Sequence, residues 1–237
     1  MVKREADGIN QEEEKKEYRM FDHVFFDVDS CLAGIEGIDE LAQLHNCTEE
    51  IGQFTQAAMN GEVELEEVFE KRLDIINPRI EDLEIIGQKY IETVTHHAPE
   101  VIGFLQGIGM NVWLISGGYD EAIFPLADYL QIPRVRVMAN HLYFNTDGTY
   151  LGFDKMNPLC RQFGKKECIA RLKVAGVIQG TTAIVGDGIS EVETKGIIDL
   201  CIGFGGHVAR ENVRTTADIF VRDKTLVPLV PILIQKV

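Results

Sequence analysis

Short, continuously apolar runs that end in acidic residues or glycine constrain the fold of this chain more than any other feature. They span residues 23–28, 111–116 and 182–186, with shorter runs at 135–138 and 200–204. Because apolar and polar residues do not alternate in them, the runs fit strands of a parallel sheet covered on both faces. Helical patterns lie between them, at 99–106, 122–130, 165–174 and 191–197. This alternation predicts an α/β fold with a doubly wound, mostly parallel sheet.

An interval of about 80 residues without a convincing strand separates the first two predicted strands, which is too long for an ordinary crossover. Its segments at 38–45, 49–58, 65–76 and 80–93 place apolar residues three and four positions apart. We therefore expect a helical cap subdomain over residues 35–95, inserted into a core of residues 19–34 and 96–237. Residues 1–18 form a polar leader that we expect to be disordered. Alternation on both sides of residues 145–148 predicts a hairpin within the core.

The net charge of the chain limits the kinds of partner that it can bind. It has 38 acidic and 23 basic residues, a formal charge of −15, which disfavours nucleic acid and anionic membranes. The apolar run at 226–234 contains two prolines and is far shorter than the roughly 20 residues of a membrane-spanning helix. The N-terminus has no apolar signal segment, and the five cysteines have no C-x-x-C spacing. We expect a cytoplasmic monomer or homodimer with reduced, mostly buried cysteines.

Polar residues that could take part in catalysis or ligand binding follow three of the predicted strands. Asp27 and Asp29 follow the first, Ser116, Gly117 and Gly118 the second, and Asp187 and Glu191 the strand at 182–186. Each loop alone is also compatible with an ordinary solvated turn. Lys165 opens a predicted helix, where a cation is unfavourable unless an anion lies nearby.

These loops are expected to meet, since ligand sites of open α/β sheets lie at the carboxyl ends of the strands. Together they contain a carboxylate nucleophile, a second carboxylate that transfers a proton, and a serine and a lysine that hold phosphate oxygens. Acidic loops of this kind also supply oxygen ligands for Mg²⁺. The combination describes phosphoryl transfer.

The motif order D-x-D-S, S-G-G, G-K and G-D-G resembles the haloacid dehalogenase superfamily of aspartate-nucleophile phosphatases, and within it the phosphoserine phosphatases. The resemblance runs from about Phe21 to Phe220 and includes EGIDEL at 36–41, AMNG at 58–61, GFD at 152–154 and IGFGG at 202–206. It implies a Rossmann-like core with an inserted cap. It also implies Mg²⁺-dependent hydrolysis of a small phosphate ester, O-phospho-L-serine, to L-serine and phosphate through an aspartyl-phosphate, a reaction of L-serine biosynthesis.

The resemblance also implies roles for individual residues. Asp27 is the nucleophile, Asp29 the acid that protonates the leaving oxygen and later activates water, and Lys165, Ser116 and Gly117 hold the phosphate. The implied metal ligands are Asp27, the Val28 carbonyl oxygen, Asp29, Asp187 and Glu191. The implied substrate contacts are Glu36 for the ammonium group, Arg72 for the carboxylate, and Met59 and Ser190. A surface role for Arg72 and core packing for Met59 are the simpler alternatives.

Four positions depart from the pattern of the phosphoserine phosphatases. Glu191 stands where Asp is usual, Ser190 where Asn or Thr is usual, Cys31 replaces Thr, and Leu65 replaces Phe. These departures leave two alternatives open. One is a phosphatase or phosphotransferase that acts on another small phosphorylated metabolite, and the other is a catalytically impaired, phosphoserine-binding regulatory protein. A panel of phosphorylated substrates would distinguish the first alternative from a phosphoserine phosphatase. Binding of phosphoserine without its hydrolysis would indicate the second.

Overall fold

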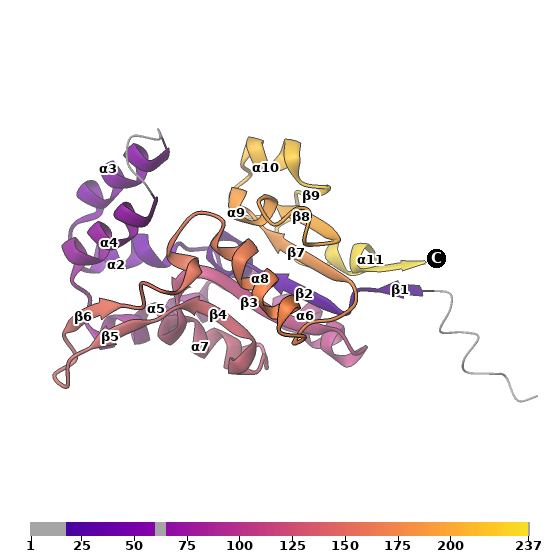
Figure 1. Ribbon diagram of the computed structural model, residues 1–237, viewed down its shortest axis with the longest axis horizontal. Coiled ribbons are helices and arrows are strands. Elements are labelled where there is room, and N and C mark those ends of the chain that lie inside the picture. The colour runs from indigo at the N-terminus through magenta and orange to yellow at the C-terminus, as the bar shows by residue number, and fades with distance from the viewer. Residues whose placement is uncertain (1–17, 60–64, 237) are drawn as a thin grey trace, which may run out of the picture.

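The computed structural model describes residues 18–59 and 65–236, and its centre is a six-stranded parallel sheet (Figure 1). The strand order is β4 (Val137–Asn140), β3 (Asn111–Tyr119), β2 (His23–Phe26), β7 (Thr182–Gly186), β8 (Leu200–Phe204) and β9 (Ile219–Val221). The doubly wound parallel sheet predicted from the sequence is thereby confirmed. Strand β9 was not predicted. Strand β4 begins two residues later than predicted because Arg134–Arg136 form a 3₁₀ turn.

Helices cover both faces of this sheet. Successive residues of β2 enter different cores: Val24 and Phe26 pack with helices α6 (Ala98–Gly107) and α7 (Asp120–Tyr129), whereas Phe25 packs with α8 (Gly164–Val174). Because neighbouring side chains of a strand point to opposite faces, an apolar run without alternation is what two covered faces require. Trp113 lies in the second core and is 6% exposed.

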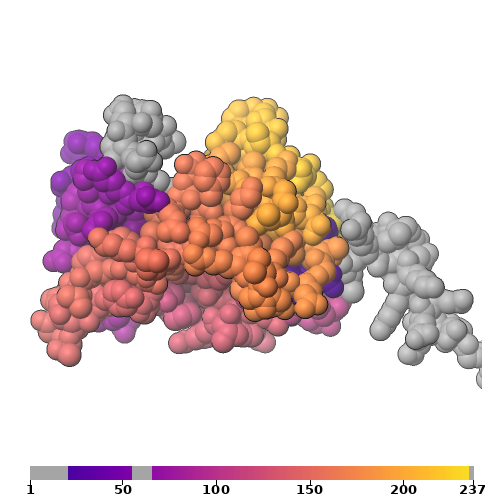
Figure 2. Space-filling view, in the orientation of Figure 1, coloured from indigo at the N-terminus to yellow at the C-terminus, as the bar shows by residue number. Residues whose placement is uncertain are grey.

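Four helices occupy the predicted insert. They are α2 (Gly37–Leu44), α3 (Thr48–Met59), α4 (Leu65–Ile76) and α5 (Ile80–Glu92), each within one or two residues of its expected bounds. Helices α2, α3 and α4 gather at one end of the molecule (Figure 1), and in the space-filling view their indigo and purple surface stands apart from the yellow C-terminal segment (Figure 2). Helix α5 packs directly against α7 of the core. The subdomain boundaries at 35 and 95 stay predictions.

The predicted hairpin is present as β5 (Leu142–Phe144) and β6 (Tyr150–Phe153), but it forms a sheet of its own. Its turn contacts the start of α5: Ile80 N donates to Gly148 O at 3.0 Å, and the Arg79 guanidinium donates to Asp147 O at 2.7 Å. The hairpin therefore joins the inserted helices to the core.

Some predicted bounds are wrong near the C-terminal half. The helix expected at 191–197 is the single turn α9 (Ile189–Val192), and Gly196, with φ of +92°, excludes a helix from the end of the predicted range. Three elements were not predicted: α10 (Glu211–Thr216), α11 (Leu229–Leu233), and a two-stranded sheet of β1 (Tyr18–Met20) with β10 (Ile234–Lys236). The leader expected at 1–18 lies outside the described residues except for Tyr18, which begins β1.

Two further expectations concern cysteines and membranes. All five cysteines are free thiols, and Cys31, Cys160 and Cys201 are buried. Within residues 18–59 and 65–236, no helix has both the length and the apolar character that crossing a membrane requires.

Candidate active site

The carboxyl ends of β2 and β7 lie side by side at the point where the strand order reverses. Phe26 of β2 pairs with Val185 of β7, and Asp27 N donates to Val185 O at 2.9 Å. The next residues of the two strands therefore bring Asp27 and Asp187 to the same edge of the sheet. Both carboxylates are buried, with exposed fractions of 7% and 4%. This is the position where doubly wound sheets bind their ligands.

Lys165 supplies the positive charge at this edge. It is the second residue of α8, and its Nζ lies 2.7 Å from Asp27 Oδ1 and 2.5 Å from Glu191 Oε1. Burial alone lowers the pKa of Lys165, but the two carboxylates outweigh burial and raise it. Lys165 is therefore a permanent cation, and these two anions explain why a lysine is tolerated at a helix N-terminus.

Glu191 is fully buried and accepts three hydrogen bonds in this cluster. Besides Lys165, Ser190 Oγ donates to its Oε1 at 2.8 Å, and Gly188 N donates to its Oε2 at 2.8 Å. A Cβ atom on residue 186 would lie 2.5 Å from the Glu191 carboxyl carbon, so the glycine of the G-D-G motif provides the space for the longer side chain. The predicted substrate contact Ser190 thus points to Glu191.

Asp27, Asp187 and Glu191 form a cluster that fits a divalent cation. One carboxylate oxygen of each lies within 4.8 Å of the others, and all three residues are buried. Burial raises the pKa of Asp27 and of Asp187, and mutual repulsion adds to both shifts, although Lys165 opposes them. The remaining nearby cation is Arg210, whose Nε donates to Asp187 Oδ2 at 2.9 Å. Three buried carboxylates with oxygen donors are the environment that Mg²⁺ and similar hard cations require.

The two further predicted metal ligands have other partners. Val28 begins a tight turn over Val28–Leu32, and its carbonyl oxygen accepts a hydrogen bond of 3.0 Å from Ala33 N. Asp29 is outside the carboxylate cluster. Within the same turn Ser30 adopts a left-handed conformation with φ of +52°. The turn therefore directs the two carboxylates of the D-x-D-S motif to different surroundings.

Asp29 accepts hydrogen bonds on both carboxylate oxygens. Tyr90 Oη and Gly37 N donate to Oδ1, each at 2.7 Å, and Ser116 Oγ donates to Oδ2 at 3.0 Å. The Ser116 hydroxyl oxygen in turn accepts from Gly118 N at 2.9 Å. This network brings the ends of β2 and β3 together, as the motif order predicts.

The S-G-G segment, which the structure places in the last part of β3 and not in the loop expected after residue 116, is oriented by a residue of the adjacent strand. Asn140, at the end of β4, is fully buried and donates from Nδ2 to Gly117 O at 2.8 Å. Gly117 itself is exposed. The contact holds the backbone of the S-G-G motif in place.

Glu36 lies at the start of α2, next to the turn after β2. Its Oε1 accepts a hydrogen bond of 2.7 Å from Ser30 Oγ and lies 3.5 Å from the Arg210 guanidinium. Loss of solvation raises the pKa of Glu36 to about 7, and repulsion from Asp29 adds to the effect. Arg210 thus connects Glu36 with Asp187 of the carboxylate cluster.

The remaining predicted substrate residues lie on α3 and α4. Arg72, on α4, is half-buried, and its Nε is a buried donor without a hydrogen-bond partner among the described residues. Its charge acts on Asp39 of α2 and on Tyr119 at the end of β3. A buried donor without a partner is costly, which favours a ligand there over a surface role. Met59 ends α3, and its side chain, like that of Leu65, lies outside the described residues.

Three residues of the site were not identified from the sequence. Asn140 is the last residue of β4, so a search of every strand end would have found it, whereas Arg210 lies six residues after the end of β8. Tyr90 lies inside α5, where its spacing is that of an ordinary core residue. Only the packing of α5 brings its hydroxyl to Asp29.

Comparisons with known proteins show the family to which the chain belongs. No family model matches the chain. Phosphoserine phosphatase of Homo sapiens is 33% identical over 215 residues, 91% of this chain and 95% of that protein. The chloroplastic phosphoserine phosphatase of Arabidopsis thaliana is 35% identical over 203 residues, 85% of this chain and 68% of that protein.

Solved structures show the same likeness in three dimensions. A substrate-bound phosphoserine phosphatase complex is 28% identical with a TM-score of 0.74, over 90% of this chain and 99% of that one. A phospho-aspartyl intermediate analogue of phosphoserine phosphatase has the same identity, TM-score and coverage. Because relatives above 30% identity are covered over most of their length, this chain belongs to the phosphoserine phosphatase family of the haloacid dehalogenase superfamily.

Proposed function

We propose that this protein is a Mg²⁺-dependent phosphatase that hydrolyses O-phospho-L-serine to L-serine and phosphate, as in L-serine biosynthesis. The observation that carries the proposal is the position of Asp27. It is a buried carboxylate at the end of β2, 2.7 Å from Lys165 Nζ and clustered with Asp187 and Glu191. Family membership supports the choice of phosphoserine.

The reaction proceeds in two steps at Asp27 and Asp29. A carboxylate oxygen of Asp27 forms a bond to phosphorus while the bond from phosphorus to the serine oxygen breaks, and Asp29 donates a proton to that oxygen. A water molecule then attacks phosphorus, gives its proton to Asp29, and displaces Asp27 with release of phosphate. The hydrogen bonds of Gly37 and Tyr90 hold Asp29 in place for both proton transfers.

Lys165 and the S-G-G segment of β3 hold the phosphate group. Lys165 contributes a permanent positive charge beside the attacking carboxylate, and the backbone of Gly117 contributes a hydrogen bond. The Ser116 hydroxyl, which donates to Asp29 in the structure, donates to the phosphate when substrate is bound. Mg²⁺, when bound, offsets the negative charge of the phosphate oxygens and of Asp27. Asp27, Asp187 and Glu191 are its proposed side-chain ligands, with the Val28 carbonyl oxygen and Asp29 as the further predicted ones.

Substrate choice depends on the inserted helices. Glu36 attracts the ammonium group of phosphoserine, and the Arg72 guanidinium, whose Nε has no partner among described residues, binds its carboxylate. Met59 and Ser190 are the further proposed contacts. Residues 35–95 act as a cap that excludes water while the phospho-aspartate forms. Free thiols at all five cysteines support a cytoplasmic location, and we propose a monomer or a homodimer.

A second candidate is a regulatory protein that binds phosphoserine without turnover. Glu191 favours it, because the longer side chain is engaged by Lys165, Ser190 and Gly188 where a shorter acid is usual. An alternative of the same chemistry is turnover of another small phosphate ester.

Phosphate release separates these candidates. We would measure release from L-phosphoserine with and without Mg²⁺, beside phosphothreonine, phosphotyrosine and phosphoethanolamine, with Asp27→Asn as the blank. Selective, Mg²⁺-dependent release that Asp27→Asn abolishes supports the proposal. Release that favours another ester overturns the substrate. No release, with phosphoserine raising the melting temperature, establishes the regulatory candidate.

A further inference from the structure

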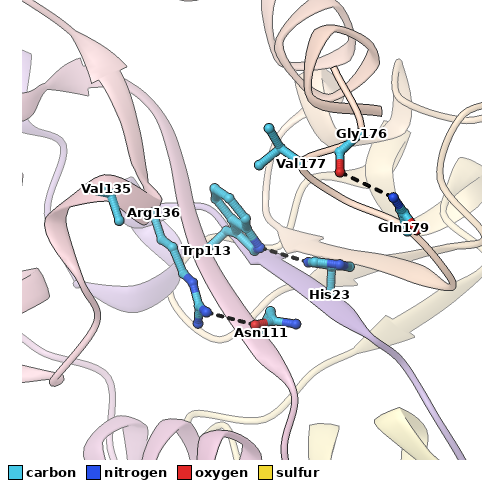
Figure 3. A pocket seen from close by; sticks show the side chains of 8 residues that line it. All are labelled: His23, Asn111, Trp113, Val135, Arg136, Gly176, Val177 and Gln179. Carbon is cyan, nitrogen blue, oxygen red and sulfur yellow. Dashed lines mark hydrogen bonds between the residues drawn. The ribbon is translucent and has the colours of Figure 1, made fainter. Parts of the chain in front are cut away.

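A second pocket lies at the amino ends of β2 and β3, away from the carboxyl ends that bear Asp27 and Ser116 (Figure 3). It has a volume of about 510 Å³. His23 and Asn111, the first residues of the two strands, lie on its floor with Trp113. Arg136 approaches from the start of β4, and Val177 and Gln179 approach from the loop after α8. None of these residues takes part in the proposed reaction.

Arg136 contributes a positive charge to this pocket and forms no ion pair with any residue that the structure describes. Its guanidinium donates to Asn111 Oδ1 at 2.7 Å and lies 5.8 Å from the centre of the Trp113 ring. In the part of the chain that the structure describes, Arg79, Arg134, Arg161, Arg171, Arg210 and Arg214 each lie within 4.0 Å of an acidic oxygen. Arg72, Arg136 and Arg222 do not, and of these three only the half-buried Arg136 lines this pocket. Of its five N–H donors, one has a hydrogen-bond partner among the described residues, so the other four can bind an anion.

The other ionisable groups near the pocket have partners of their own. Burial lowers the pKa of His23, and its Nδ1 accepts a hydrogen bond of 3.1 Å from Trp113 Nε1, so the imidazole is neutral. Asp22 accepts hydrogen bonds from the backbone and the hydroxyl of Thr181, at 2.7 and 2.9 Å. Lys173 donates to Ile197 O on the opposite side of β7.

Apart from Arg136 and His23, the lining combines polar side chains, Asn111 and Gln179, with the apolar side chains of Trp113, Val135 and Val177. Trp113 stacks on Phe25 at 5.8 Å between ring centres, so a ligand can reach only its remaining surface. Val177 and Val135 border the pocket with exposed fractions of 54% and 87%. An isolated cation beside an aromatic ring and exposed valines complements a molecule with one anionic end and one apolar end.

We propose that this pocket binds a small carboxylate with a flat apolar body, its carboxylate on the Arg136 guanidinium and its body between Trp113 and Val177. A guanidinium binds a carboxylate through two parallel hydrogen bonds, which a neutral amide cannot reproduce. The site is distinct from the phosphate site, and its occupancy does not depend on turnover.

Trp113 makes the proposal directly testable, since it is the single tryptophan of the chain and lies in the pocket. The full-length Asp27→Asn variant is titrated with benzoate and, separately, with benzamide, and tryptophan emission is followed. We expect a saturable change with benzoate and at least a tenfold weaker response to benzamide. Equal responses to the two compounds, or none to benzoate, would overturn the proposal.

Two variants locate the binding. Arg136→Gln should weaken benzoate binding at least tenfold, whereas Arg134→Gln, whose arginine pairs with Asp128 at 2.6 Å outside the pocket, should leave it unchanged. Val177→Trp fills the pocket without removing its charge, and benzoate binding, followed here by calorimetry, should be lost. Unchanged binding in both Arg136→Gln and Val177→Trp would contradict the site. Thermal unfolding of each variant checks that it is folded.

Discussion

Tyr90 Oη donates a hydrogen bond of 2.7 Å to Asp29 Oδ1, which joins helix α5 to the turn after β2. Tyr90 is fully buried, and Gly37 N donates to the same oxygen. A Cβ atom on residue 37 would lie 2.3 Å from the Tyr90 hydroxyl, so only glycine leaves space for both donors. The two donors fix Asp29 Oδ1 and leave Oδ2 facing Ser116. Tyr90 is thus a positioning residue for the proposed acid.

Removing the Tyr90 hydroxyl should slow the chemical step. In Tyr90→Phe we expect kcat for phosphoserine to fall about tenfold, since a hydrogen bond to a charged group contributes about 1.5 kcal/mol. KM should stay nearly constant because Tyr90 has no proposed contact with substrate. Steady-state kinetics measures both constants. Tyr129→Phe, on the exposed side of α7, is the control and should behave like the unaltered protein. An unchanged kcat in Tyr90→Phe would show that the hydrogen bonds from Gly37 and Ser116 are enough to position Asp29.

Lys165 should be necessary for stability as well as turnover. Lys165→Met leaves Asp27 and Glu191 buried without their cation, which costs about 3 kcal/mol in the free energy of unfolding. The loss should be smaller at pH 5 than at pH 8, because a protonated carboxyl does not need the lysine. Urea unfolding in metal-free buffer measures this free energy. Lys166→Met is the matched control, since its Nζ bonds only a backbone oxygen, at 3.1 Å. Equal losses in the two variants would contradict a special role for Lys165.

Glu191 should be better adapted to this site than the shorter acid usual in the family. In Glu191→Asp the carboxylate cannot reach Gly188 N and Lys165 together. The Mg²⁺ concentration for half-maximal activity should therefore increase about tenfold, the usual lower limit for a defect next to a metal site. Activity measured against Mg²⁺ concentration gives this value, with Glu193→Asp as the control. A decrease instead would show that Glu191 impairs the metal site and would favour the regulatory candidate.

The sequence predicted the strand ends that meet at the site because each carries its own local signal. Asp27, Ser116 and Asp187 directly follow continuous apolar runs, and parallel strands bring such ends to one edge. Lys165 was also predictable, since a lysine at the start of a helix requires a nearby anion.

The sequence could not predict contacts that depend on how distant elements pack. Leu83, Ile86 and Tyr90 share one face of α5, and nothing in that spacing distinguishes a phenol that fills the core from one that binds Asp29. The contact between Arg210 and Asp187 likewise spans 23 residues and joins loops of two different strands. The helix at α9 was predicted too long because apolar residues continue at helical spacing to Ile197. Gly196 has a φ of +92°, which an α-helix does not contain.

Titration of Glu36 should control the affinity for the ammonium group. Loss of solvation and repulsion from Asp29 and Asp187 raise the pKa of Glu36 to about 7, although Ser30 and Arg210 oppose the shift. Below that pH the carboxyl is neutral and no longer attracts a cation, so KM for phosphoserine should rise as pH falls from 8 to 6. The phosphate group titrates near pH 6 as well. The ratio of KM for phosphoserine to KM for 3-phosphooxypropionate, which lacks the ammonium group, cancels that contribution.

The same titration of Glu36 should also make the free energy of unfolding depend on pH. The folded carboxyl of Glu36 keeps its proton up to about pH 7, whereas an unfolded one releases it near 4.5, so the folded state binds more protons between these values. The free energy of unfolding therefore falls as pH rises through this window. Glu36→Gln should remove this contribution to the change of the free energy of unfolding with pH. In the same variant the KM ratio should stay at its high value at every pH. If the ratio still changes near pH 7 in Glu36→Gln, another group recognises the ammonium group. Glu49→Gln, the same change at an exposed residue of α3, is the control.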